Sequence, residues 1–237
     1  RNMSSAASDV YKRQQLLFLE PPTQKHAHLK LKIYNVDGSL AENCVNGIRA
    51  LALYAFDESL VFSNTFILQI EDNLAQITRL QENEFAVKMS SFKFTKSSCA
   101  IADSQELQFN FEGTDIKFYP VSVGNPHAVI FQDSLSDQIP EMGLTLQESN
   151  IYKNGVNVGF VKILNEKEIN LRVVERGVGE TLACGSGACA AVLSGVKNNL
   201  LQSSVLVNFK KGKLKVEVNL DEEWFNLIGE AKYIEKG

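Results

Sequence analysis

The chain has 237 residues, of which 44% are hydrophobic and 22% are charged, and its formal net charge is −4. These values are typical of one compact unit or two small domains with a sizeable core. No basic or repetitive segment indicates binding to nucleic acid, and no apolar run approaches the ~20 residues that span a bilayer. Four cysteines without close pairing, in a chain without a secretory signal, predict reduced thiols and a cytoplasmic location.

The first residues differ in character from the rest of the chain. Residues 1–14 are small and polar with scattered charge, and we expect the native sequence to begin near Gln15. Two histidines, His26 and His28, follow the first predicted strand with a spacing that could suggest a metal. Because no cysteine or carboxylate pattern accompanies them, we expect exposed loop histidines and no metal site.

Alternating or β-branched apolar residues, bounded by turn residues, predict many short strands. The predicted strands are residues 15–20, 29–34, 65–70, 75–80, 85–89, 107–111, 116–123, 169–174, 205–209, 214–218 and 225–228, with another opening at Asn157. A polar loop with a short helix is expected over residues 134–150. A helix over residues 48–56 is apolar nearly all round, so other elements must enclose it, and a strongly curved sheet is the expected enclosure.

A glycine-rich bend near residue 180 joins a predicted strand to a helix of small residues over 188–193. Cys184 stands at this bend, directly before the helix. Unpaired N–H groups and the dipole at a helix start favour negative charge, which lowers the pKa of a thiol and produces a reactive thiolate. The alternative is a buried, inert cysteine, because unpaired cysteines are usually core residues. Cys99 and Cys189 fit that alternative.

The same plan occurs in the first half of the chain. A strand runs into an acidic, glycine-containing bend, then Cys44, then the apolar helix, so that residues 44–47 align with residues 184–187. Two copies of one supersecondary unit predict a duplicated architecture with a pseudo-two-fold axis. Such an axis would bring both helix starts, and both thiols, to face each other across one cleft.

Two thiols on opposite sides of a substrate suit the inversion of a carbon that bears hydrogen. One acts as the base and the other as the acid, as a reversible racemase or epimerase requires, and the pattern needs no cofactor. The backbone N–H groups beside the cysteines could hold the substrate carboxylate and the charge that develops when the α-proton leaves. These N–H groups belong to Val45, Asn46, Gly185 and Ser186.

Four ordered blocks, residues 35–49, 124–127, 157–160 and 175–191, resemble the cofactor-independent diaminopimelate epimerases. The resemblance implies epimerisation of the small molecule LL-diaminopimelate to its meso form, on the way to lysine and cell-wall peptide. It also implies a possible homodimer, since the family often forms dimers.

The resemblance assigns roles to further residues. It implies catalysis by Cys44 and Cys184, and a substrate lined by Gln15, Asn35, Asn125, Asn157, Glu175 and Arg176, with His127 and Glu175 supporting catalysis. Beside the bend, Arg176 offers a planar fork for a carboxylate and Glu175 an acceptor for an ammonium, which together match an amino-acid terminus.

Two departures from the family pattern leave alternatives open. The family's opening Gly-Leu-Gly-Asn-Asp-Phe-like segment is absent, and Val45 replaces a usual glycine, which could crowd or strain the anion-binding turn. The chain could therefore be another cofactor-free amino-acid racemase or isomerase of the same fold, or an inactive truncated homologue.

The expected fold class is α/β (α+β), with two pseudo-symmetric halves. Each half is a curved, mostly antiparallel sheet around a central helix, and the active site lies between them. We expect an N-terminal half over residues 1–89, lacking its first strand, and a C-terminal half over 90–226. Residues 227–237 would form a closing strand that could return to the first half.

Overall fold

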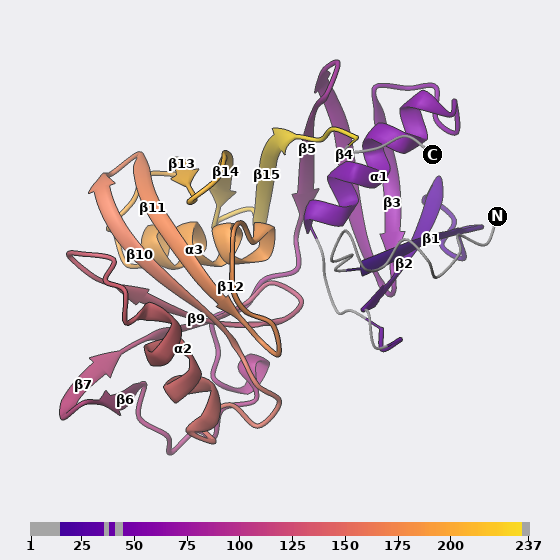
Figure 1. Cartoon of the computed structure of the whole chain (residues 1–237). Coiled ribbons are helices and arrows are strands. Elements are labelled where there is room, and N and C mark those ends of the chain that lie inside the picture. The colour runs from indigo at the N-terminus through magenta and orange to yellow at the C-terminus, as the bar shows by residue number, and fades with distance from the viewer. Residues whose placement is uncertain (1–14, 36–37, 41–44, 234–237) are drawn as a thin grey trace, which may run out of the picture.

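The computed structural model describes residues 15–35, 38–40 and 45–233. Figure 1 shows two lobes, each of which surrounds one long helix with strands. The first lobe contains β1 (Gln15–Glu20), β2 (Leu29–Asn35), α1 (Val45–Asp57), β3 (Thr65–Ile70), β4 (Asn73–Gln81) and β5 (Glu84–Met89).

The second lobe follows after residue 90. It contains η2 (Ser97–Cys99), β6 (Gln108–Phe111), β7 (Thr114–Lys117), β8 (Tyr119–Ser122), β9 (Pro126–Phe131), α2 (Ile139–Glu148), β10 (Asn157–Asn165), β11 (Glu168–Glu175), β12 (Gly179–Thr181), α3 (Gly185–Lys197), β13 (Ser204–Asn208), β14 (Lys213–Asn219) and β15 (Trp224–Glu230). Together the lobes have the predicted fold class, a mixed α/β protein with curved sheet around few helices.

One continuous sheet runs through both lobes. Among the described residues its order is β1-β2-β3-β4-β5-β15-β14-β13-β11-β10-β9-β8, with β12 added beside β11, while β6 and β7 form a separate hairpin. The last strand joins the lobes, because β15 pairs antiparallel with β14 on one side and with β5 on the other, from Phe225 opposite Met89 to Glu230 opposite Glu84. The boundaries proposed for the two halves stay a prediction.

The central helix of each lobe consists of residues that can be buried on all sides. In α1 the large apolar side chains of Ile48, Leu51 and Leu53 are buried, and in α3 every residue from Gly185 to Gly195 is buried. Small residues let strands approach α3 closely: a Cβ on Gly187 would come within 2.9 Å of Cγ2 of Val173. The apolar helices therefore form the core of their lobes, as their composition predicts.

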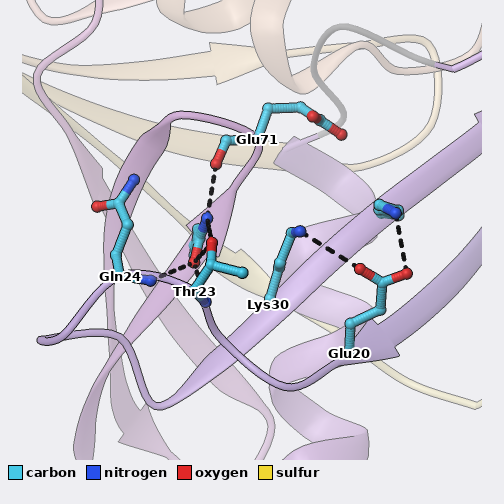
Figure 2. A network of polar contacts seen from close by, with 7 residues as sticks. Glu20, Thr23, Gln24, Lys30 and Glu71 are labelled. Atoms are coloured by element: carbon cyan, nitrogen blue, oxygen red, sulfur yellow. Dashed lines mark hydrogen bonds and ion pairs between the residues drawn. The ribbon is translucent and has the colours of Figure 1, made fainter.

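Figure 2 shows the contacts that hold the segment between β1 and β2 in the first lobe. The buried side chain of Gln69 accepts the backbone N–H of Thr23 at 2.9 Å and donates to the carbonyl of Glu71 at 3.0 Å. Nearby, Glu20 pairs with Lys30 at 3.4 Å and with Lys32 at 3.0 Å. The buried amide contributes more than the surface ion pairs, which are worth little in water.

Several predicted elements differ from the observed ones. The single strand expected over 116–123 is two strands, β7 and β8, because β7 turns back to pair with β6 while Phe118 between them is buried, with its N–H bonded to the carbonyl of Leu107. The strand β9 was not predicted. Both central helices are longer than predicted, since tertiary burial outweighs the low helix propensity of Gly47 in α1 and of Gly185 and Gly187 in α3.

No helix among the described residues is long and apolar enough to cross a membrane. Within the same part of the chain, no group of three or more histidine, cysteine or carboxylate side chains could hold a metal ion. His26 and His28 belong to the segment between β1 and β2, where the backbone N–H of Ile67 donates to Nδ1 of His28 at 3.1 Å. That ring nitrogen therefore accepts a hydrogen bond from strand β3.

Candidate active site

Cys184 is the N-cap of α3. Its backbone is extended, with φ −129° and ψ 112°, and its Sγ accepts the N–H of Gly187 at 3.4 Å. The hydroxyl Oγ of Ser186 lies 3.5 Å from the same sulfur. The thiol is therefore directed at the N–H groups that open the helix, where the dipole favours a negative charge. This is the position at which the sequence predicts a reactive thiol.

The start of α1 lies against the start of α3. Nδ2 of Asn46 donates to the carbonyl of Ala183 at 3.4 Å. A Cβ on Gly185 would come within 2.8 Å of Oδ1 of Asn46 and within 3.3 Å of Cβ of Val45. The two predicted anion-binding turns thus meet, although they are about 140 residues apart in the chain. Cys44, the second predicted thiol, lies outside the described residues.

Val45 is buried at the start of α1. It is the first residue of that helix and is 1% exposed. The missing side chain of Gly185 leaves room for it. The crowding expected at this turn is therefore taken up by packing against a glycine on the other helix.

A second group of predicted residues lies where β9, β10 and β11 meet. Asn157 is opposite His127 in the parallel register of β10 and β9. Oδ1 of Asn157 accepts the backbone N–H of Arg176 at 2.9 Å, and Nε2 of His127 lies 3.2 Å from Oδ1 of Asn125. Four residues from three separate blocks of the sequence are therefore brought together by strand pairing and hydrogen bonds.

His127 is a neutral side chain in this group. It is 1% exposed, and burial, helped by the positive charge of Arg176, lowers its pKa to about 3. The neutral ring can donate from Nε2 to Oδ1 of Asn125. Its arrangement suits holding Asn125 in place, and an imidazolium is not available for acid catalysis near neutral pH.

Glu175 and Arg176 stand at the end of the hairpin between β11 and β12. Glu175 accepts a hydrogen bond from Oγ1 of Thr181 across that hairpin. Arg176 is exposed, and its Nη1 donates to the carbonyl of Asn154 at 2.7 Å. Gly177 has a φ of +72°, which a tight turn after Arg176 requires. A carboxylate and a guanidinium thus belong to two consecutive residues at this turn.

Gln15 and Asn35 belong to the first lobe. They lie opposite each other in the antiparallel ladder of β1 and β2. The contacts described above do not connect them to Cys184, so their role at the site stays a prediction.

The other cysteines of the second lobe are core residues. Cys99 is 1% exposed and Cys189 is fully buried, and burial raises the pKa of both thiols, that of Cys189 to about 12. Both are therefore protonated thiols at neutral pH, in agreement with the interpretation from sequence.

An ion-pair cluster beside the hairpin was not predicted. Nε and Nη2 of Arg172 hold Glu180 at 2.7 and 2.9 Å, and Lys210 pairs with the same carboxylate at 2.9 Å. These hydrogen bonds, that of Arg172 above all, lower the pKa of Glu180 to about 2. The cluster fixes the chain shortly before Cys184. The feature of the sequence that could have indicated this cluster is Glu180, the acidic residue inside the glycine-rich bend.

Known proteins of one family are similar to this chain over most of its length. The family model for diaminopimelate epimerase matches residues 119–234. The diaminopimelate epimerase of Teredinibacter turnerae is 33% identical over 94% of this chain and 82% of its own length. That of Acinetobacter baumannii is 37% identical over 86% of this chain and 74% of its own length.

Solved structures share the fold at low sequence identity. A probable proline racemase from Agrobacterium radiobacter has a TM-score of 0.68 at 12% identity, covering 91% of this chain and 73% of that one. A protein of the phenazine biosynthesis PhzF family from Enterococcus faecalis has a TM-score of 0.61 at 15% identity, covering 94% of this chain and 82% of that one.

Proposed function

The chain belongs to the diaminopimelate epimerase family, and on that premise we propose that it interconverts LL- and meso-diaminopimelate with two thiols and no cofactor. The observation that carries the proposal is the contact between the two helix starts, at Gly185 and Asn46, with Cys184 capping one of them. Cys44 directly precedes the other helix in sequence.

The proposed chemistry is a proton transfer in two parts. One thiolate removes the α-proton, and the electron pair moves into the adjacent carboxylate. The other cysteine, as a thiol, then delivers its proton to the opposite face of the α-carbon. One sulfur has gained a proton and the other has lost one, so the reverse reaction uses the same groups with their roles exchanged.

Backbone N–H groups would stabilise the charge that develops on the carboxylate. The start of α3 supplies those of Gly185 and Ser186, and the start of α1 supplies those of Val45 and Asn46. Both helix dipoles favour an anion at these ends. Such fixed donors need no reorganisation when the proton leaves, which is why their effect on rate is large.

The distal end of the substrate is itself an amino-acid terminus. We propose that Glu175 accepts its ammonium and that Arg176 binds its carboxylate, with Asn125 and Asn157 completing the distal site. Supporting this, Thr181 holds the Glu175 carboxylate, and the Asn157 side chain fixes the backbone of Arg176. Binding the distal end would orient the reacting carbon between the thiols. Gln15 and Asn35 would contact the substrate from the first lobe.

The proposal extends to the setting of the reaction. We propose a role in lysine and peptidoglycan precursor synthesis in the cytoplasm, and a homodimer as the assembly to test. The names of the related proteins support the biosynthetic role.

The direct test is an assay with LL-diaminopimelate under reducing conditions, with the isomers separated by chiral chromatography. We expect meso-diaminopimelate to appear with the unsubstituted chain. Turnover should fall by at least about a thousandfold in Cys184→Ala, because the chemistry loses its acid or base. Cys99→Ala removes a buried thiol elsewhere and should remain active. Activity in Cys184→Ala would contradict the mechanism, and inversion of proline in place of diaminopimelate would replace the proposed substrate.

A further inference from the structure

Arg49 is a buried charged side chain that the proposed mechanism does not use. It lies in the second turn of α1 and is 7% exposed. Its Nη2 donates to Oδ1 of Asn46, one turn earlier, at 2.9 Å. Because burial of a guanidinium costs free energy, a buried arginine usually makes specific hydrogen bonds.

Arg49 fixes which way the Asn46 amide points. A guanidinium has only donors, so it must bind the oxygen of the amide and not its nitrogen. With Oδ1 turned to Arg49, Nδ2 of Asn46 is left to donate to the carbonyl of Ala183 at 3.4 Å. Ala183 directly precedes Cys184. The arginine thus connects α1 to the chain segment that carries the thiol.

Arg49 also reaches the other elements at this junction. A Cβ on Gly229 of β15 would lie 3.5 Å from Nε of Arg49. In α3, the positive charge of Arg49 acts on Cys189 and opposes the rise of its pKa. The guanidinium therefore lies where α1, α3 and the strand that joins the two lobes come together.

We infer that Arg49 is a positioning residue that holds the two helix starts at the separation needed for inversion. The inference rests on the proposed function. Inversion with two thiols needs both sulfur atoms within reach of one α-carbon, from opposite faces. A displacement of about 1 Å in such a geometry can reduce the rate by about a hundredfold. The chain from Arg49 through Asn46 to Ala183 fixes that geometry across the lobes.

A cavity lies beside Arg49, so the role of Arg49 can be tested by adding guanidinium ion to a variant that lacks this side chain. Arg49, Asn46 and Ala183 line a cavity of about 550 Å³ together with exposed lysines, Lys211 and Lys213 among them. A small guanidinium ion can therefore approach the position of the Arg49 head group in a variant that lacks it. Lys213 supplies a matched control, since it lines the same cavity but has no part in the contacts to Asn46.

The experiment compares Arg49→Met, Arg49→Lys and Lys213→Met with the unsubstituted chain in D₂O, starting from LL-diaminopimelate. Two early rates are measured by NMR: deuterium entry into remaining LL substrate, and formation of deuterated meso product. In Arg49→Met we expect kcat to fall about 10- to 100-fold with KM changed less than about threefold. The ratio of exchange to inversion should rise at least threefold, because a misplaced second thiol fails to deliver its proton while the first still removes one.

The ratio separates positioning from loss of folded protein. Both rates come from the same folded molecules, so a lower folded fraction reduces them equally and leaves their ratio unchanged. Guanidinium at about 10 mM should lower the raised ratio of Arg49→Met and leave that of Lys213→Met unchanged. Arg49→Lys keeps a charge but loses the planar fork, so its ratio should lie between those of the unsubstituted chain and Arg49→Met.

The outcomes distinguish this inference from the function on which it rests. If the unsubstituted chain forms no meso product, the proposed function fails. If the unsubstituted chain is active and Arg49→Met has the same ratio of exchange to inversion, Arg49 does not position the thiols. Should Arg49→Met fail to fold, Arg49→Lys decides: a raised ratio supports positioning, and an unchanged ratio overturns it.

Discussion

Gly185 lies so close to Asn46 that a Cβ on the glycine would come within 2.8 Å of Oδ1 of that asparagine. The same Cβ would come within 3.3 Å of Cβ of Val45. Only a glycine allows the start of α3 to approach the start of α1 this closely. The residue is thus required by the contact between two helices rather than by its own backbone conformation.

Gly185→Ala should separate the two helix starts. Since the neighbours are a helix start and buried side chains, we expect a loss of about 1–3 kcal/mol in the free energy of unfolding, measured by urea denaturation. We also expect kcat to fall at least tenfold.

Gly159→Ala is the control for this change. A Cβ at Gly159 would meet its nearest neighbour, Cδ1 of Leu171, at 3.5 Å, which is ordinary contact. Equal effects of the two substitutions on kcat would show that the approach at Gly185 is not important for activity.

Asn157→Ala should lower the stability of the folded protein and weaken binding of the distal end of the substrate. Asn157 is 7% exposed, and its side chain accepts the backbone N–H of Arg176. Loss of the acceptor leaves that N–H unsatisfied, at a cost of about 1–3 kcal/mol, and KM should rise as Arg176 moves. At the other end of β10, exposed Asn165 accepts the N–H of Lys167, so Asn165→Ala should cost less than about 0.5 kcal/mol. A similar loss in both variants, with KM unchanged, would contradict the role given to Asn157.

His127 should make stability depend on pH. Burial lowers its pKa in the folded protein to about 3, from 6.5. Between these values the unfolded chain binds the proton and the folded protein does not. The contribution is complete above pH 6.5 and is lost as pH falls from 6.5 toward 3, with a loss of about 2 kcal/mol between pH 7 and pH 5. Urea unfolding of the unsubstituted chain and of His127→Gln at both pH values measures it, and equal pH dependence in the two proteins would refute it.

Val45→Gly should destabilise the protein without improving catalysis. Val45 is buried at the start of α1 in a helical conformation, so the substitution removes packing and lowers helix propensity. We expect a loss of about 2 kcal/mol, measured by urea denaturation, and no rise in kcat. A kcat that rises more than about threefold would show that the valine strains the turn after all.

Local pattern predicted much of this fold. The strand over residues 65–70 was found with the predicted bounds, and Cys184 lies directly before a helix because the bend and the small residues around it are local signals. The sheet boundaries near Phe118 were missed, since a turn of β7 onto β6 depends on partners outside the apolar run itself.

Long-range contacts between buried polar groups could not be predicted. The hydrogen bond from Asn46 to Ala183 joins residues 137 positions apart, and nothing in the sequence near Arg49 shows that its charge is buried. The neutral state of His127 likewise depends on burial under residues of other strands. Sequence pattern could therefore name the candidates at the site, but not the contacts that hold them.

Two thiols on opposite faces of the substrate predict a distinct pattern of α-proton exchange in Cys44→Ala and Cys184→Ala, each incubated with LL- and with meso-diaminopimelate in D₂O. If the two thiols act on opposite faces, neither variant inverts the substrate. Each variant should exchange the reacting α-proton of one isomer only, and the two variants should act on opposite isomers. Inversion by either variant, or exchange of both isomers by one of them, would contradict the two-thiol mechanism.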